Sequence, residues 1–171
     1  LATSGWIDRD SDGVLDKNGK KFAFEMLIIS GSAVTNQFAQ TVQAEMKKIG
    51  VQMDIRSVDG TAIRQQTRAG NFDAAYLAWQ LDADPDPHSL FHSSQFPPQG
   101  QNFVHYSNPE ADRLIQDARA ELNHEARKAL YWRLHEVLAD DQPYTWTVQV
   151  SVKWGLRKRM HGVLASPAYG L

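Results

Sequence analysis

Residues 22–58 read FAFEMLIISGSAVTNQFAQTVQAEMKKIGVQMDIRSV, and this stretch decides the fold. Apolar residues alternate in its first part and again in its last part, which is the two-residue period of a β-strand. Between these parts, apolar residues recur every three or four positions from Val34 to Ile49, as on one face of a helix. Ser30-Gly31-Ser32 breaks the first strand and offers a cap for the start of that helix, and Gly50 is suited to end it. The stretch therefore predicts a strand with one well-buried face, a helix and a second strand.

The same alternation continues downstream. Residues 61–69 read as a short polar helix that ends at Gly70, and residues 73–79 are nearly continuously apolar. Such an apolar run is typical of a strand that is covered on both faces of a parallel sheet. The order strand, helix, strand, helix, strand predicts an open α/β sheet, mostly parallel and flanked by helices, with right-handed crossovers.

Residues 80–108 depart from this pattern, because they carry four prolines and little periodicity. Long ordered loops of this kind are usually functional. The sequence predicts four elements within and beyond the loop: a short helix at about 88–93, a helix that begins at the Asn108-Pro109 cap, a helix at about 124–140, and an apolar strand at 144–154.

Composition excludes several classes of protein. The 171 residues fit one domain, residues 1–171, and 18 Lys and Arg against 20 Asp and Glu give a net charge of −2. No basic field exists to hold a nucleic-acid backbone. No apolar run of 18 residues exists to span a membrane. The absence of cysteine from the sequence excludes disulfides, thiol catalysis and cysteine zinc sites.

Aspartates near the start of the chain match the first half of an EF-hand calcium loop. Asp8, Asp10 and Asp12 have the required spacing, and Asp16 falls at the ninth position. Gly19 stands at the twelfth position, where the motif needs a bidentate Glu. The motif therefore has two readings, a weak calcium site formed by these four aspartates or a polar turn that leads into the first strand.

The segment from Trp79 to Pro87 follows the third predicted strand. Ligands of open α/β sheets bind beyond the carboxyl ends of the strands, and this segment offers an indole and three carboxylates there. It is either a ligand site, with Trp79 as a flat apolar wall, or a solvated acidic turn shaped by prolines. Paired aspartates such as Asp82 and Asp84 also suit acid–base hydrolysis, but the spacing does not establish the separation that such a reaction needs.

Three histidines of the long loop are candidates for a metal site. His88 and His92 are four residues apart, and His105 follows nearby. Together with the aspartates they offer ligands for a transition metal. The HExxH signature is absent, and two histidines at helical spacing often occur by chance, so ordinary loop histidines are the alternative.

Six short segments occur in a fixed order along most of the chain: Gly5-Trp6-Ile7-Asp8 with Asn18-Gly19-Lys20, Ile49-Gly50-Val51, Gly70-Asn71-Phe72-Asp73, Trp79 with Asp82 and the Asp-Pro pairs, Tyr106 to Asp112, and Asp141-Gln142-Pro143. Together they resemble the family 5 extracellular solute-binding proteins, which are the peptide- and nickel-binding subunits of ABC importers. The resemblance implies a two-lobed protein that closes on its ligand. It identifies residues 1–171 as one lobe, the C-terminal one, of a type II periplasmic-binding-protein fold.

The resemblance also implies roles for four residues. The carboxylate of Asp82 would pair with the α-amino group of a bound peptide, and Trp79 would pack on a ligand side chain. Asn102 would bond the peptide backbone with its amide, and Gln80 is a further candidate. We therefore expect an exposed cleft face around Trp79, Asp82 and Asn102.

The expected function is that of a receptor without catalytic activity or cofactor. Its expected partners are a peptide, bound in the cleft between the lobes, and a membrane ABC permease. The resemblance places such a monomeric protein in the periplasm or outside the cell, with room for a lipid anchor upstream of Leu1. Nickel complexes, oligosaccharides and haem are alternative ligands within the class. A carboxylate hydrolase and a calcium-stabilised interaction module are the alternatives outside it.

Overall fold

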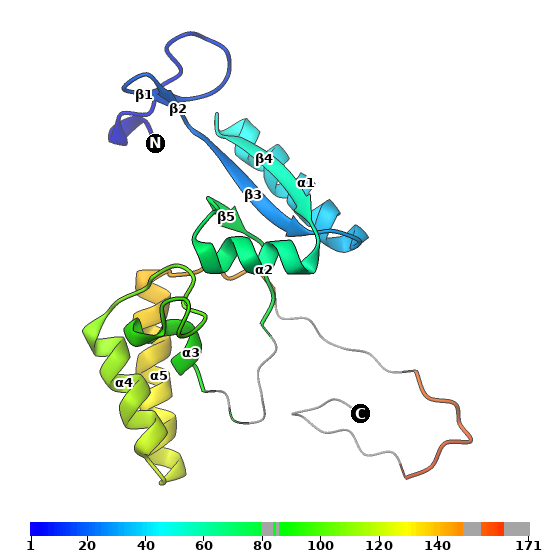
Figure 1. Ribbon diagram of the computed structural model, residues 1–171, viewed down its shortest axis with the longest axis vertical. Coiled ribbons are helices and arrows are strands. Elements are labelled where there is room, and N and C mark those ends of the chain that lie inside the picture. Colours follow the sequence, from blue (N-terminus) through cyan, green and yellow to red (C-terminus); the bar gives the residue numbers. More distant parts are fainter. Residues whose placement is uncertain (80–83, 85, 149–154, 163–171) are drawn as a thin grey trace. The chain divides into compact units, whose positions relative to one another are not determined.

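A computed structural model describes residues 1–79, 84, 86–148 and 155–162 (Figure 1). The chain divides into two compact units, Leu1–Trp79 and Gln80–Leu171, and each is described by itself. Whether they form the single lobe expected over residues 1–171 stays a prediction. Within the described ranges, no helix combines the length and the apolar character needed to cross a membrane.

The first unit is built on a parallel sheet in the order β4-β3-β5. Its strands are β3 (Ala23–Ile29), β4 (Gln52–Val58) and β5 (Ala74–Ala75). Met26 of β3 is the partner of Ile55 on one side and of Ala74 on the other. This arrangement confirms the strand–helix–strand prediction for residues 22–58.

Two helices connect these strands, and their ends follow from local chemistry. Helix α1 (Ala33–Lys48) begins where the Ser32 hydroxyl accepts the main-chain N–H of Thr35 at 3.2 Å. Helix α2 (Gly60–Ala69) ends at Gly70, whose φ of +71° is the left-handed conformation that glycine adopts without strain. Both caps were predictable because they involve neighbours in the sequence.

The core of this unit differs from the expected pattern in one respect. Leu27 and Ile28 are consecutive residues of β3, and both have no exposed surface. Consecutive side chains of a strand point to opposite faces, so β3 is covered on both faces. The prediction of one buried face was therefore wrong. The other buried apolar residues of the unit are Ala39, Val51, Met53 and Ile63.

The third strand is shorter than the apolar run 73–79 suggested. Only Ala74–Ala75 pairs as a strand, although the N–H of Tyr76 still donates to the carbonyl of Leu27 at 2.9 Å. Beyond it Leu77 is 37% exposed. Among the described residues, β5 pairs with β3 on one side and has no neighbouring strand on the other. An apolar sequence does not by itself lengthen a strand, because each further residue needs a partner to pair with.

A small hairpin precedes the sheet. The 3-10 helix η1 (Ala2–Ser4) is followed by β1 (Asp16–Lys17) and β2 (Lys20–Lys21), which pair antiparallel. The two residues between the strands, Asn18 and Gly19, have φ values of +53° and +73°. Two positive φ values in a two-residue loop define the tight turn that Asn-Gly favours.

The second unit is helical. It contains α3 (His88–Phe91), the 3-10 helix η2 (Ser93–Gln95), α4 (Pro109–Ala120) and α5 (His124–Asp141). Figure 1 shows α4 and α5 packed side by side, and their contact buries Leu114, Ile115, Ala118, Leu134, Val137 and Leu138. The Asn108 side chain caps α4 by accepting from the N–H groups of Glu110 and Ala111, with Pro109 at the first helical position. The predicted cap is confirmed.

The apolar segment that follows α5 does not form the predicted strand in its described part. Residues 144–148 are not assigned to a strand in the described structure, and Trp146 and Val148 are 51% and 66% exposed. Tyr144 and Trp146 instead gather around Phe91, with ring centroids 5.2 and 6.0 Å from it. A strand needs a neighbour to pair with, and the described part of this unit has none. The rest of the predicted strand lies outside the described residues.

Candidate functional site

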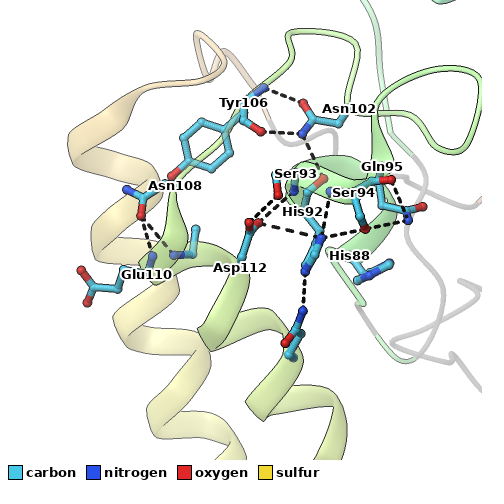
Figure 2. A network of polar contacts seen from close by, with 12 residues as sticks. His88, His92, Ser93, Ser94, Gln95, Asn102, Tyr106, Asn108, Glu110 and Asp112 are labelled. Atoms are coloured by element: carbon cyan, nitrogen blue, oxygen red, sulfur yellow. Dashed lines mark hydrogen bonds and ion pairs between the residues drawn. The ribbon is translucent and has the colours of Figure 1, made fainter.

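Two of the four expected ligand-binding residues, Trp79 and Asn102, are described, and they belong to different units. Trp79 ends the first unit and is half-buried. Gln80 and Asp82 lie outside the described residues. Asn102 belongs to the second unit. The described candidate site is therefore the loop around Asn102 (Figure 2).

Asn102 is the centre of that loop. Its side chain has no exposed surface. Its Nδ2 donates to the carbonyls of His92 and Tyr106 at 3.2 and 2.8 Å, and its Oδ1 accepts the N–H of Tyr106 at 2.9 Å. The expected exposed face at Asn102 is not seen, because both amide hydrogens are committed to the loop's own backbone. Its described role is to close residues 92–106 into a fixed shape, and a direct contact with a ligand stays a prediction.

Gly100 allows the loop to fold this tightly. A Cβ at this position would lie 2.6 Å from the Cβ of Gln95 and 2.7 Å from its carbonyl oxygen. That carbonyl accepts the N–H of Asn102 at 3.0 Å. The N–H of Gln101 also donates to the carbonyl of Ser89 at 2.9 Å, which joins the loop to α3.

His92 connects the loop to α4. The ring is 7% exposed, its Nδ1 accepts the main-chain N–H of Ser94 at 3.1 Å (Figure 2), and its Nε2 lies 2.8 Å from the amide nitrogen of Gln116. A main-chain N–H only donates, so Nδ1 carries a lone pair and the ring hydrogen is on Nε2. An Nε2–H can donate only to the oxygen of the Gln116 amide, so this tautomer requires that amide to be turned by 180°, with its oxygen in the place of the nitrogen that faces the ring.

Asp112, in the first turn of α4, holds the other side of this loop. It accepts from the N–H and the hydroxyl of Ser93 at 2.8 and 2.5 Å. Its carboxylate is 3.9 Å from the Nδ1 of His92. In a nucleophilic relay, serine and carboxylate bond opposite nitrogens of the histidine. Here Ser94 and Asp112 face the same nitrogen, so this cluster positions the backbone and does not activate a hydroxyl.

The paired aspartates of the hydrolase alternative are not seen as a pair. Asp82 lies outside the described residues. Asp84 is an exposed residue that forms an ion pair with Arg127. Nothing in the described part of the chain therefore supports acid–base hydrolysis at this segment.

The histidine metal site is also not seen. His88 and His92 stack with ring centroids 4.6 Å apart, and His105 stacks on Phe96 at 4.8 Å. Partial burial, together with nearby Arg119 and His92, lowers the pKa of His88. In the residues that the structure describes, three potential ligand atoms converge only at Asp8, Asp10 and Asp12.

Asp16, the fourth aspartate of the calcium hypothesis, is not part of that convergence. It is 8% exposed, and it accepts from the N–H of Arg9 at 3.0 Å and from its guanidinium at 2.6 Å. These two hydrogen bonds lower the pKa of the Asp16 carboxyl. Asp16 thus pairs with Arg9 and lies outside the group formed by Asp8, Asp10 and Asp12, and calcium binding by the four aspartates stays a prediction.

One further contact ends the loop. The Tyr106 hydroxyl and the Asn108 amide donate to the same oxygen of Asp141, at 2.6 and 2.7 Å. These bonds lower the pKa of Asp141, while burial and the facing carboxylate raise that of Tyr106. Sequence reasoning missed this contact and the His92 network, since both join residues that are distant in the sequence.

Comparisons with known proteins agree on one family. The model of the bacterial extracellular solute-binding proteins, family 5 Middle, matches residues 1–102. The oligopeptide-binding protein AppA of Bacillus subtilis is 36% identical over 169 residues, which are 98% of this chain and 31% of that protein. The nickel-binding periplasmic protein of Escherichia coli is 26% identical over 149 residues, 84% of this chain and 28% of that protein.

Solved structures give the same result. AppA of Bacillus subtilis in complex with a nonapeptide superposes with a TM-score of 0.78 and 38% identity, over 84% of this chain and 29% of that one. NikZ of Campylobacter jejuni in complex with Ni(L-His) has a TM-score of 0.70 and 27% identity, over 83% of this chain and 29% of that one. The expected α/β fold class of a periplasmic-binding-protein lobe is confirmed. The chain spans about a third of the length of these relatives.

Proposed function

Because the chain belongs to the family 5 bacterial extracellular solute-binding proteins, we propose that it is one lobe of the peptide-binding component of an ABC importer. The observation that carries this proposal is the 36% identity to the oligopeptide-binding protein AppA across 98% of the chain. The likeness to AppA in complex with a nonapeptide supports the same ligand class. The lobes of such receptors close around the ligand by a hinge motion.

The proposed ligand contacts lie at the end of the first unit and beyond it. Asp82 pairs with the peptide's α-amino group, while Trp79 and Gln80 contact the neighbouring part of the peptide. A carboxylate that faces an ammonium group in a closed cleft is strongly coupled to it. The Asn102-centred loop contributes a rigid wall of the cleft, because its amide fixes the backbone from His92 to Tyr106.

We further propose that the closed receptor delivers its peptide to a membrane ABC permease and works in the periplasm or on the outer surface of the cell, with or without a lipid anchor. The receptor performs no chemistry on the peptide. The arrangement of Ser93, Ser94, His92 and Asp112 supports this, because it positions backbone and lacks the geometry of a nucleophilic relay.

Native mass spectrometry of the full-length protein that contains this chain tests the proposal. The protein is mixed with peptides of increasing length and with the same peptides N-acetylated. We expect retention of the free peptides and loss of the acetylated ones. Asp82→Asn should weaken binding by at least about 30-fold, because removing one partner of a buried charge pair costs about 2–5 kcal/mol.

Asp84→Asn is the matched control, since Asp84 already pairs with Arg127 at the surface. Equal retention of free and acetylated peptides removes the Asp82 anchor but keeps the peptide class. If no peptide is retained, the peptide proposal fails. Retention of a Ni(II)–histidine complex in that case favours the second candidate, a nickel receptor, which the likeness to NikZ in complex with Ni(L-His) supports.

A further inference from the structure

The aspartate loop before the first sheet contains a cation that belongs to the chain itself. Asp8, Asp10 and Asp12 each place a carboxylate oxygen within 4.8 Å of the others. Three like charges this close repel one another unless a positive charge lies between them. The described structure pairs Lys21 with two of the three, Asp10 and Asp12.

The β1–β2 hairpin determines where Lys21 lies. The Asn18-Gly19 turn pairs Asp16 with Lys21 and Lys17 with Lys20. A shift of one residue in this register would send the Lys21 side chain to the opposite face of the hairpin. The glycine that disqualifies the EF-hand match at its twelfth position is therefore the residue that turns the chain and returns a lysine to the loop.

The Lys21 ammonium group is fully matched by acceptors. Its Nζ lies 2.7 and 2.6 Å from the two oxygens of Asp10 and 2.8 Å from Oδ2 of Asp12. An ammonium group has three N–H donors, and three carboxylate oxygens surround this one. Hydrogen bonds to both aspartates raise the pKa of Lys21. The bond from Lys21 is also the main cause of the lowered pKa of Asp12.

The remaining carboxylate oxygens are arranged around this contact. Oδ2 of Asp8 accepts the N–H of Gly13 and Oδ1 of Asp12 accepts that of Val14, each at 2.9 Å. Oδ1 of Asp8 is buried without a hydrogen-bond partner among the described residues. Arg9 occupies Asp16 in a second ion pair. Two side-chain cations of the chain thus pair with three of the four aspartates of the motif, Asp10, Asp12 and Asp16.

We propose that Lys21 is the resident cation of this loop and stands in the place of a metal ion, so that the loop forms and the protein works without calcium. The three carboxylates bind a divalent cation only when the Lys21 ammonium is removed. The alternative reading of the motif, a calcium site in the natural protein, is thereby replaced by a metal-independent loop with a tethered positive charge.

Calorimetric titration with calcium chloride, on the full-length protein stripped with a chelator, tests this proposal. The variants are Lys21→Met, which keeps the length of the side chain and removes its charge, and Lys20→Met, the matched control on the exposed neighbour in β2. We expect no saturable binding by the natural protein or by Lys20→Met. Lys21→Met should bind one ion with a Kd of roughly 0.1–1 mM, the range of extracellular calcium modules, and the double variant Lys21→Met/Asp12→Asn should not.

A second measurement, made on the natural protein, tests the proposal even if Lys21→Met folds poorly. In the natural protein, ¹⁵N NMR should show slow hydrogen exchange at the Nζ of Lys21 and a signal that about 5 mM calcium, roughly five times the upper end of that range, leaves unchanged. Saturable calcium binding by the natural protein, or displacement of the Lys21 signal by calcium, overturns the proposal. Failure of a folded Lys21→Met variant to bind calcium also overturns it, because the carboxylates would then form no cation site.

Discussion

At the scale of single residues, Asn102 is the side chain that holds the long loop in its shape. Asn102→Ala removes two donors and one acceptor from the buried carbonyl of His92 and the partly buried backbone of Tyr106. Leaving a buried polar group unpaired costs about 1–3 kcal/mol. We therefore expect the free energy of unfolding, measured by urea denaturation, to fall by roughly 2 kcal/mol. Ser107→Ala, at an exposed position of the same loop, is the control, and an equal effect of both variants would contradict this role of Asn102.

His92 gives a prediction that involves no mutation. The N–H of Ser94 reserves Nδ1 as an acceptor, so the ring hydrogen belongs on Nε2, opposite Gln116. Long-range ¹H–¹⁵N NMR at neutral pH distinguishes the two tautomers directly. A hydrogen on Nδ1 would contradict the Ser94 contact. Gln116→Leu should leave the tautomer unchanged, because the main chain and not the amide determines it.

At the scale of elements, the fold of the loop depends on the absence of a side chain at Gly100. In Gly100→Ala the new Cβ would meet Gln95 at 2.6 Å, and part of that contact is backbone that cannot swing aside. The loop must then open at the hydrogen bond from the N–H of Asn102 to the carbonyl of Gln95. We expect faster amide hydrogen exchange at Asn102 and Tyr106 and a lower melting temperature. Gly155→Ala is the control, since an added Cβ there meets no atom within 4 Å; a similar loss in both variants would refute the steric reason.

The junction between the loop and the end of α5 should make stability depend on pH. Hydrogen bonds from Tyr106 and Asn108 lower the pKa of Asp141 in the folded state below its unfolded value. The resulting stabilisation is complete above the unfolded pKa of about 3.9 and is lost as the pH falls through the folded pKa. Asp141→Asn should therefore lower stability at pH 7, and the difference from the natural protein should shrink on acidification.

Chemical denaturation of both proteins from pH 7 to pH 3 measures this difference. Asp140→Asn, one residue earlier at an exposed position, is the matched control and should show the smaller difference at every pH. A difference for Asp141→Asn that is constant over this range would mean that its hydrogen bonds do not favour the ionised form.

At the scale of the whole molecule, local and distant interactions explain what the sequence predicted and what it did not. The cap within Ser30-Gly31-Ser32, the helix end at Gly70 and the Asn108-Pro109 cap are predictable because caps are made by near neighbours. The strand expected after α5 needs a partner strand, and apolar alternation does not say where that partner is. The expectation of Asn102 on a cleft face comes from the family resemblance, and its contact with a ligand stays a prediction. Its burial depends on residues 92–106 folding around it, and no spacing rule reports that.

The proposed function also makes the isolated chain an incomplete receptor. The chain spans about a third of the length of its relatives, so a ligand held between two lobes finds only part of its contacts here. In such a cleft both lobes contribute favourable contacts with the ligand. A ligand that binds to one lobe alone loses the same translational freedom but gains only that lobe's contacts. We expect the 171-residue chain to bind peptides at least about 100-fold more weakly than the full-length protein, by calorimetry on samples whose melting transitions show that they are folded. Equal affinity would place every important contact within this chain and would argue against a cleft shared between two lobes.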